Sequence, residues 1–212
     1  VQEARDLRIH LMDANDVLWA QSIGGDYLSE QWRAGDTVYQ VFEIVLPAGI
    51  PAGVYEPRLV LSREGGGQLP VFVDGEPVGV SLPLGNIELL PQGRTIQPLS
   101  DEGTAFGDVL GARNASTVSG TYQPGSSLQF EVTWQAQETL AKDYAFQLAF
   151  VNAEGAVAEA IQAPLAGEYP TSAWERGEVV RAVSRVTVPS LPAGEYALRL
   201  TVGELQGEIS LG

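Results

Sequence analysis

The 212-residue chain has no cysteine, a single histidine and a single methionine. The absence of cysteine excludes disulfides, thiolate metal sites and cysteine nucleophiles. His10 stands out of phase with Ile9 and Leu11 in an alternating stretch, so its ring is expected to point to solvent. No Gly-x-Ser-x-Gly elbow and no phosphate-binding loop occurs. The sequence therefore predicts a protein that is not an enzyme and that holds no cofactor and no metal.

Basic residues are also scarce, with 12 Lys and Arg against 27 Asp and Glu, which gives a formal net charge of −15. Such a balance argues against binding to nucleic acid or to anionic lipid, because both need clustered positive charge. Solubility through self-repulsion is the simplest interpretation, and cation binding by acidic loops is the alternative. No apolar run approaches the roughly 18 residues of a membrane span. This segment is therefore not expected to insert into a membrane directly.

An internal repeat is the clearest positive signal. It centres on a Trp-x-x-Gly motif followed by an acidic residue. In the alignment of the two copies, Trp32 matches Trp174 and Gly35 matches Gly177. The matched segments are 7–15 with 146–154, 26–38 with 168–180, 50–55 with 191–196, and 85–89 with 207–211. Residues 95–139 precede the second copy and have no counterpart before the first. Either the first copy lacks its N-terminal strands, or another chain supplies them.

Alternating apolar and polar residues predict strands throughout the chain, separated by turns rich in glycine and proline. The expected strands are 7–11, 38–46, 55–61, 128–134, 144–150, 179–188 and 196–202. A short helical turn is expected only near 137–142. The fold class is all-β, with two tandem immunoglobulin-like β-sandwich domains at 1–92 and 93–212, the first lacking its N-terminal strands. The linker is expected near Leu90–Arg94.

The chain resembles a known set of C-terminal β-sandwich regions, or tails, in three places. These are the Trp-x-x-Gly motif with its following acid, the Leu-Pro-Ala-Gly turns, and Gln68–Val71. The stretches 106–110 and 122–136 look like the start of the same unit. These tails are β-sandwich regions appended to bacterial membrane glycosyltransferases of the dolichyl-phosphate-mannose protein mannosyltransferase type, which use lipid-linked sugars. The resemblance implies an extracytoplasmic, cell-surface location, with a bacterial source. The catalytic membrane domain is absent, so no catalytic residue carries over.

Candidate contacts with carbohydrate or a partner are Trp32, Trp174, Tyr27 and Tyr169, because aromatic faces stack on sugar rings. Packing is the favoured alternative, since both tryptophans hold the same place in the repeat. Asp13 begins a stretch similar to a calcium loop, but Val17 and Leu18 break the ligand pattern, which favours a hairpin turn.

A carboxylate pair for glycoside hydrolysis among Asp101, Glu102 and Asp108 has little support. The leading hypothesis is a non-catalytic extracytoplasmic scaffold or interaction module of a larger membrane-linked protein. The alternatives are a carbohydrate-binding module and a homo-oligomer that assembles into a surface polymer by strand complementation.

Overall fold

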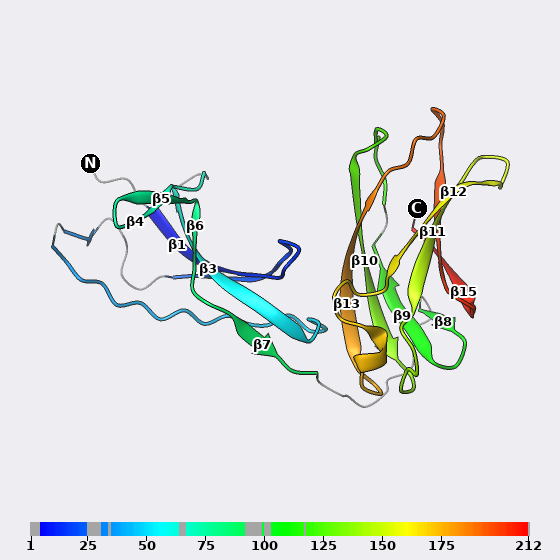
Figure 1. Cartoon of the computed structure of the whole chain (residues 1–212), viewed down its shortest axis with the longest axis horizontal. Coiled ribbons are helices and arrows are strands. Elements are labelled where there is room, and N and C mark those ends of the chain that lie inside the picture. The colour runs from blue at the N-terminus through cyan, green and yellow to red at the C-terminus, as the bar shows by residue number, and fades with distance from the viewer. Residues whose placement is uncertain are drawn as a thin grey trace. The chain divides into compact units, whose positions relative to one another are not determined.

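The computed structural model describes residues 5–24, 31–33, 35–63, 67–91, 99, 103–116 and 118–211. Over these residues the chain is nearly all β, with antiparallel sheets and very little helix (Figure 1). It divides into two compact units: unit 1 comprises Val1–Pro47 and Val54–Leu89, and unit 2 comprises Ala48–Gly53 and Leu90–Gly212. Each unit is described by itself below.

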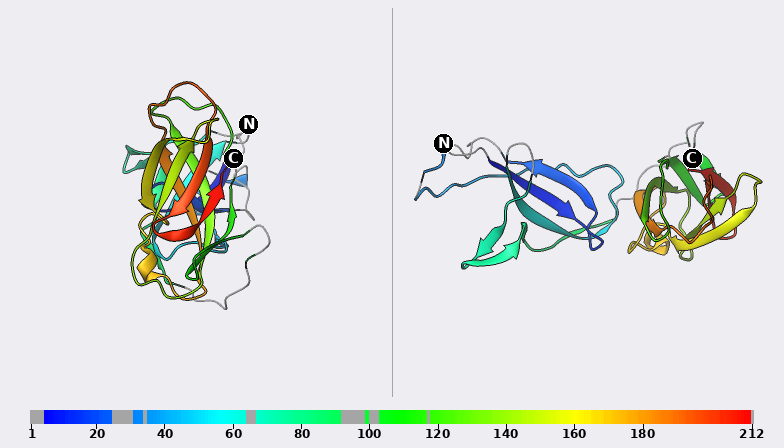
Figure 2. Two further views of the ribbon diagram at one scale, coloured as in Figure 1. Left: turned by 90° about the vertical axis from the view of Figure 1, so that its right-hand side faces the viewer. Right: turned by 90° about the horizontal axis from the view of Figure 1, so that it is seen from above.

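Unit 2 contains two four-stranded antiparallel sheets, in the orders β13-β10-β9-β8 and β12-β11-β14-β15. The first sheet consists of β8 (Thr104–Phe106), β9 (Leu110–Ala115), β10 (Ser127–Ala136) and β13 (Val179–Thr187). The second consists of β11 (Ala145–Val151), β12 (Val157–Pro164), β14 (Ala197–Val202) and β15 (Leu205–Ser210). Seen from above, the strands of unit 2 lie nearly end-on and form two layers (Figure 2).

The core of unit 2 lies between these two layers. On β10, every second side chain from Leu128 to Trp134 points inward and is almost completely buried. Phe130 meets Phe146 of β11 edge to face, with 5.4 Å between the ring centroids. Burial of each such ring contributes about 1.5–3 kcal/mol. Unit 2 is therefore a β-sandwich with one continuous core, which draws on both sheets.

Unit 1 has one larger sheet, in the order β2-β1-β3-β6, with β7 also paired to β3. Its strands are β1 (Arg5–Met12), β2 (Leu18–Ile23), β3 (Gly53–Arg63), β6 (Ser81–Pro83) and β7 (Ile87–Leu89). A separate hairpin joins β4 (Val71–Val73) to β5 (Glu76–Gly79). The hairpin turns at Asp74 and Gly75, both of which have positive φ, as two-residue hairpin turns of the primed type require.

The sheet of unit 1 matches the second sheet of unit 2 in register. Ile9 of β1 pairs with Leu59 of β3, and Leu148 of β11 pairs with Leu200 of β14. Leu59 then pairs with Leu82 on its other side, whereas Leu200 pairs with Ile209. Leu82 is thus the counterpart of Ile209. The sequence match of Gly85–Leu89 with Gly207–Leu211 is therefore wrong in register.

Two local predictions are also wrong. Residues 137–142 form bends and no helical turn, and the 3-10 turn lies instead at Thr171–Ala173. Residues 38–46 belong to no strand, despite their β-branched and aromatic composition. The reason is tertiary, because a strand exists only where a neighbouring strand accepts its backbone hydrogen bonds.

Candidate interaction surface

The repeated tryptophan motif forms a tight turn in unit 2. The backbone N–H of Glu178 donates to the carbonyl of Glu175 over 2.9 Å, and Gly177 between them has φ of 81°. A positive φ at the third residue of a turn favours glycine. The carboxylate of Glu178 accepts from the backbone N–H of Glu175 at 2.7 Å and from Tyr169 Oη at 3.0 Å. Glu178 is only 4% exposed, so this carboxylate holds the turn against the core.

Tyr169 and Trp174 lie in the same cluster. Their ring centroids are 6.1 Å apart, and Trp174 is 1% exposed. Desolvation, followed by the negative charge of Glu178, raises the pKa of the Tyr169 hydroxyl above its ordinary value. Tyr169 is therefore a neutral donor to Glu178 at physiological pH.

Unit 1 repeats this turn at the surface. The N–H of Asp36 donates to the carbonyl of Arg33 over 3.0 Å, and Gly35 has φ of 93°. The carboxylate of Asp36 accepts from the N–H of Arg33 at 2.8 Å, as Glu178 does from Glu175. Asp36 is exposed and Trp32 is half-buried. The sequence match of the two turns thus reflects one backbone conformation.

These placements bear directly on the aromatic contacts predicted from sequence. Trp174 and Tyr169 are core residues, so neither offers a ring face to a sugar or to a partner, and both drop out as candidates. The physical reason is that both rings belong to the core cluster of unit 2 and lie against one another there. Trp32 is half-buried, so part of its side chain is accessible to solvent. Tyr27 lies outside the described residues.

Asp13 begins a hairpin turn that occurs in both units. Its carboxylate accepts from the N–H groups of Asn15 and Val17, at 2.8 and 2.9 Å, and also from Trp19 Nε1 at 2.9 Å. Asn152 accepts from Ala156 in the same way at 2.8 Å. The predicted turn is confirmed, since the Asp13 oxygens are bonded to the chain's own donors.

The remaining candidate polar groups are described in turn. Among the residues that the structure describes, no group of three or more His, Cys, Asp or Glu side chains could hold a metal ion. His10 is half-buried and not directed fully to solvent as predicted, and burial together with Arg8 lowers its pKa. Asp108 is exposed next to β8, whereas Asp101 and Glu102 lie outside the described residues.

Within the described ranges, no helix has the length and hydropathy needed to cross a bilayer.

Exposed apolar side chains gather on unit 1. All but three of the large hydrophobic residues that are exposed in the described chain belong to it, the exceptions being Leu90, Tyr122 and Val157. The most exposed of them is Tyr39 at 89%, followed by Val45 at 77% and Val41 at 75%. Scattered apolar residues on a surface are ordinary, but their concentration in unit 1 makes this unit the candidate for an interaction surface.

Residues 36–47 are central to this surface, and we call them the open segment. Figure 1 draws them as a tube without an arrow. Exposure alternates along the segment: Val38 and Phe42 are half-buried, whereas Tyr39, Val41 and Val45 are exposed. Phe42 lies with its ring directly against Gly24, so a side chain at Gly24 would collide with it. The open segment thus has the two-sided pattern of a strand without belonging to a sheet.

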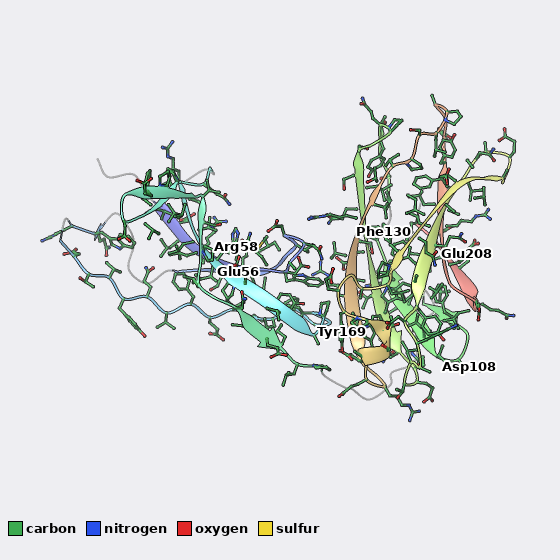
Figure 3. The ribbon with its side chains drawn as sticks, viewed as in Figure 1. Glu56, Arg58, Asp108, Phe130, Tyr169 and Glu208 are labelled. Carbon is green, nitrogen blue, oxygen red and sulfur yellow. The ribbon has the colours of Figure 1, made fainter. Side chains whose placement is uncertain are left out.

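Sequence reasoning missed the buried acid Glu178 and two sets of ion pairs. Arg181 of β13 contacts Glu131 of the neighbouring strand β10 at 2.6 Å. Arg58 of β3 bonds Glu56 on the same strand, which Figure 3 labels beside it, and Asp16 in the turn between β1 and β2. The sequence motif includes Glu178, the acidic residue after Gly177, but it does not predict that Glu178 is buried. That burial depends on its contact with Tyr169, nine residues away along the chain.

No protein-family model matches the chain, and no curated protein matches it.

Proposed function

We propose that this chain is a non-catalytic interaction module, in which unit 2 is a rigid scaffold and unit 1 presents the binding surface. The contrast between the two units is the observation that supports this function most. Unit 2 buries its large apolar side chains in one core, whereas unit 1 leaves many of its own exposed. A surface of that kind lowers its free energy when a partner covers it.

The finer parts of the proposal rest on the sequence. Two tandem immunoglobulin-like units are supported by the repeat and by the shared order of β2-β1-β3-β6 and β12-β11-β14-β15. An extracytoplasmic location, as part of a larger membrane-linked protein, follows from the resemblance to glycosyltransferase tails. Carbohydrate binding has less support, because Trp134 and Trp174 are buried and Trp19 nearly so.

Site-specific photo-cross-linking in the native cells tests the proposal. A photoreactive phenylalanine analogue would replace Tyr39 or Phe72 of unit 1 and, as matched exposed controls, Tyr122 or Val157 of unit 2. We expect the unit 1 positions to cross-link to a discrete protein and the unit 2 positions to give no adduct. Equal labelling from both units, or no protein adduct from unit 1, would contradict the assignment.

A further inference from the structure

The hairpin of β4 and β5 is an insertion that distinguishes unit 1 from unit 2. Residues 64–80 separate β3 from β6 and contain this hairpin, whereas only Gly203 and Glu204 separate β14 from β15. β6 and β15 hold the same place in the register of their sheets. The second sheet of unit 2 thus forms with a two-residue turn in the place of the hairpin.

The corner at which the hairpin is inserted lies on the surface of the fold. In unit 2 both residues of this corner are exposed, and the side chain of Glu204 is 89% exposed. Unit 2 has two sheets and one continuous core, and this corner still faces solvent. The hairpin is therefore an addition to the outside of the fold and not a part of its core. Insertions within a repeat often form its binding face.

The hairpin itself is apolar and exposed. In the described part of unit 1, β4 and β5 pair with each other in a separate two-stranded sheet, which projects from the larger sheet in the right-hand view of Figure 2. Every residue from Phe72 to Val80 is exposed. Phe72 is 58% exposed and Val78 is 48% exposed, with Val73 and Val80 close behind. A two-stranded hairpin is marginally stable by itself in water, so a partner that covers these side chains stabilises it.

The charge of the hairpin indicates what covers it. Asp74 and Glu76 are exposed, and they are the only charged residues between Gln68 and Pro83. The whole chain has a formal net charge of −15, so a second copy would bring like charges together, and an anionic lipid surface would do the same. Basic residues around an apolar contact would instead attract the hairpin and exclude wrong partners.

We propose that the β4–β5 hairpin docks into an apolar groove of a protein partner, and that lysine or arginine residues line the rim of this groove beside Asp74 and Glu76. The projecting shape fits a groove, the apolar side chains supply the buried contact, and the two acids fix the sign of the rim. This inference deepens the proposed function and rests on it, because it locates the contact within unit 1 and names the chemistry of the partner.

Site-specific photo-cross-linking of the full chain in the native cells locates the contact. A photoreactive phenylalanine analogue replaces Val78 of the hairpin or, as a control of similar exposure in the same unit, Val54 of β3. We expect Val78 to give roughly fivefold more protein adduct than Val54. Mass spectrometry of the adduct then identifies the partner's peptide, which should have apolar residues with lysine or arginine next to the cross-linked site.

A charge reversal at the hairpin tests the basic rim. Glu76 is exposed, so its replacement leaves packing unchanged. Glu76→Lys should lower the adduct yield from Val78 roughly fivefold, because a basic rim would then face a lysine. Glu76→Gln should lower the yield less, since it removes attraction without adding repulsion. Glu154→Lys, at an exposed position in the turn between β11 and β12, changes the net charge equally and should leave the yield unchanged.

Four results would overturn the inference. Equal adducts from Val78 and Val54 would remove the hairpin as the contact. An adduct of Val78 with a second copy of the chain or with lipid would name a different occupant. A partner peptide without basic residues at the cross-linked site, or an unchanged yield in Glu76→Lys, would remove the basic rim. In each case, protein adducts from Tyr39 would leave the proposed function standing and reject the hairpin assignment alone.

Discussion

Replacement of Glu178 with alanine is the sharpest test of how the repeated turn stabilises unit 2. The change removes a carboxylate that is 4% exposed and that accepts from Tyr169 Oη and from the N–H of Glu175. Each buried donor left without a partner costs about 1–3 kcal/mol. The Tyr169 hydroxyl keeps the carbonyl of Ala173 as an acceptor at 3.2 Å, and Glu175 is exposed, so the free energy of unfolding of unit 2 should fall by about 1–3 kcal/mol.

The same turn in unit 1 supplies the control. Asp36→Ala removes one bond, to the N–H of Arg33, at an exposed position. Its cost should be about 0.5–1 kcal/mol, because water replaces the lost acceptor. Urea unfolding followed by peptide-resolved hydrogen exchange reports each unit separately. Glu178→Gln, which keeps one acceptor oxygen, should lose less than Glu178→Ala. A loss below about 1 kcal/mol for Glu178→Ala, or equal losses at the two sites, would refute the reasoning.

Three further predictions address the core, the hairpins and alkaline pH. Phe130→Ala should destabilise unit 2 by about 3–5 kcal/mol in urea unfolding, whereas Val157→Ala, at a 60% exposed position, should change it by less than about 0.5 kcal/mol. Asp13→Ala and Asn152→Ala should each cost their own unit about 1 kcal/mol, with the larger loss at Asp13 because Trp19 Nε1 also loses its acceptor. Similar losses at buried and exposed positions would contradict this picture of packing. The raised pKa of Tyr169 favours its protonated form in the folded state, so stability is fully present below about pH 10 and falls above it, by up to about 1.4 kcal/mol per pH unit. Chemical unfolding at pH 9 to 11 should show a shallower fall for Tyr169→Phe, and an unchanged slope would rule out Tyr169 as the group responsible.

Much of the fold could be predicted from sequence because it depends on local pattern. The alternation in Leu128–Trp134 gave a strand with the correct inner face, since one side of β10 lies against a core. The Asp13 hairpin was also predictable, because an Asx side chain that bonds its own backbone needs only neighbouring residues.

Features that depend on distant partners could not be predicted. Residues 38–46 and β13 have similar strand patterns, yet in the described part of the chain β13 pairs with β10, whereas residues 38–46 belong to no strand. The aromatic residues of the motif gave no signal of how deeply each is buried. Trp174 is 1% exposed and belongs to the core cluster of unit 2, whereas Trp32 lies in a unit with few buried residues. The end of the first copy was misaligned because short apolar stretches near residues 82 and 87 fit the pattern equally well.

Amide hydrogen exchange of the isolated full chain, compared between residues 38–46 and residues 180–188, tests the central claim most directly. The account predicts fast exchange along the first stretch and slow exchange at the amides by which β13 pairs with β10. Equally slow exchange in both stretches of a monomeric chain would mean that the open segment already has a strand neighbour, and the account of unit 1 as a binding surface would fail.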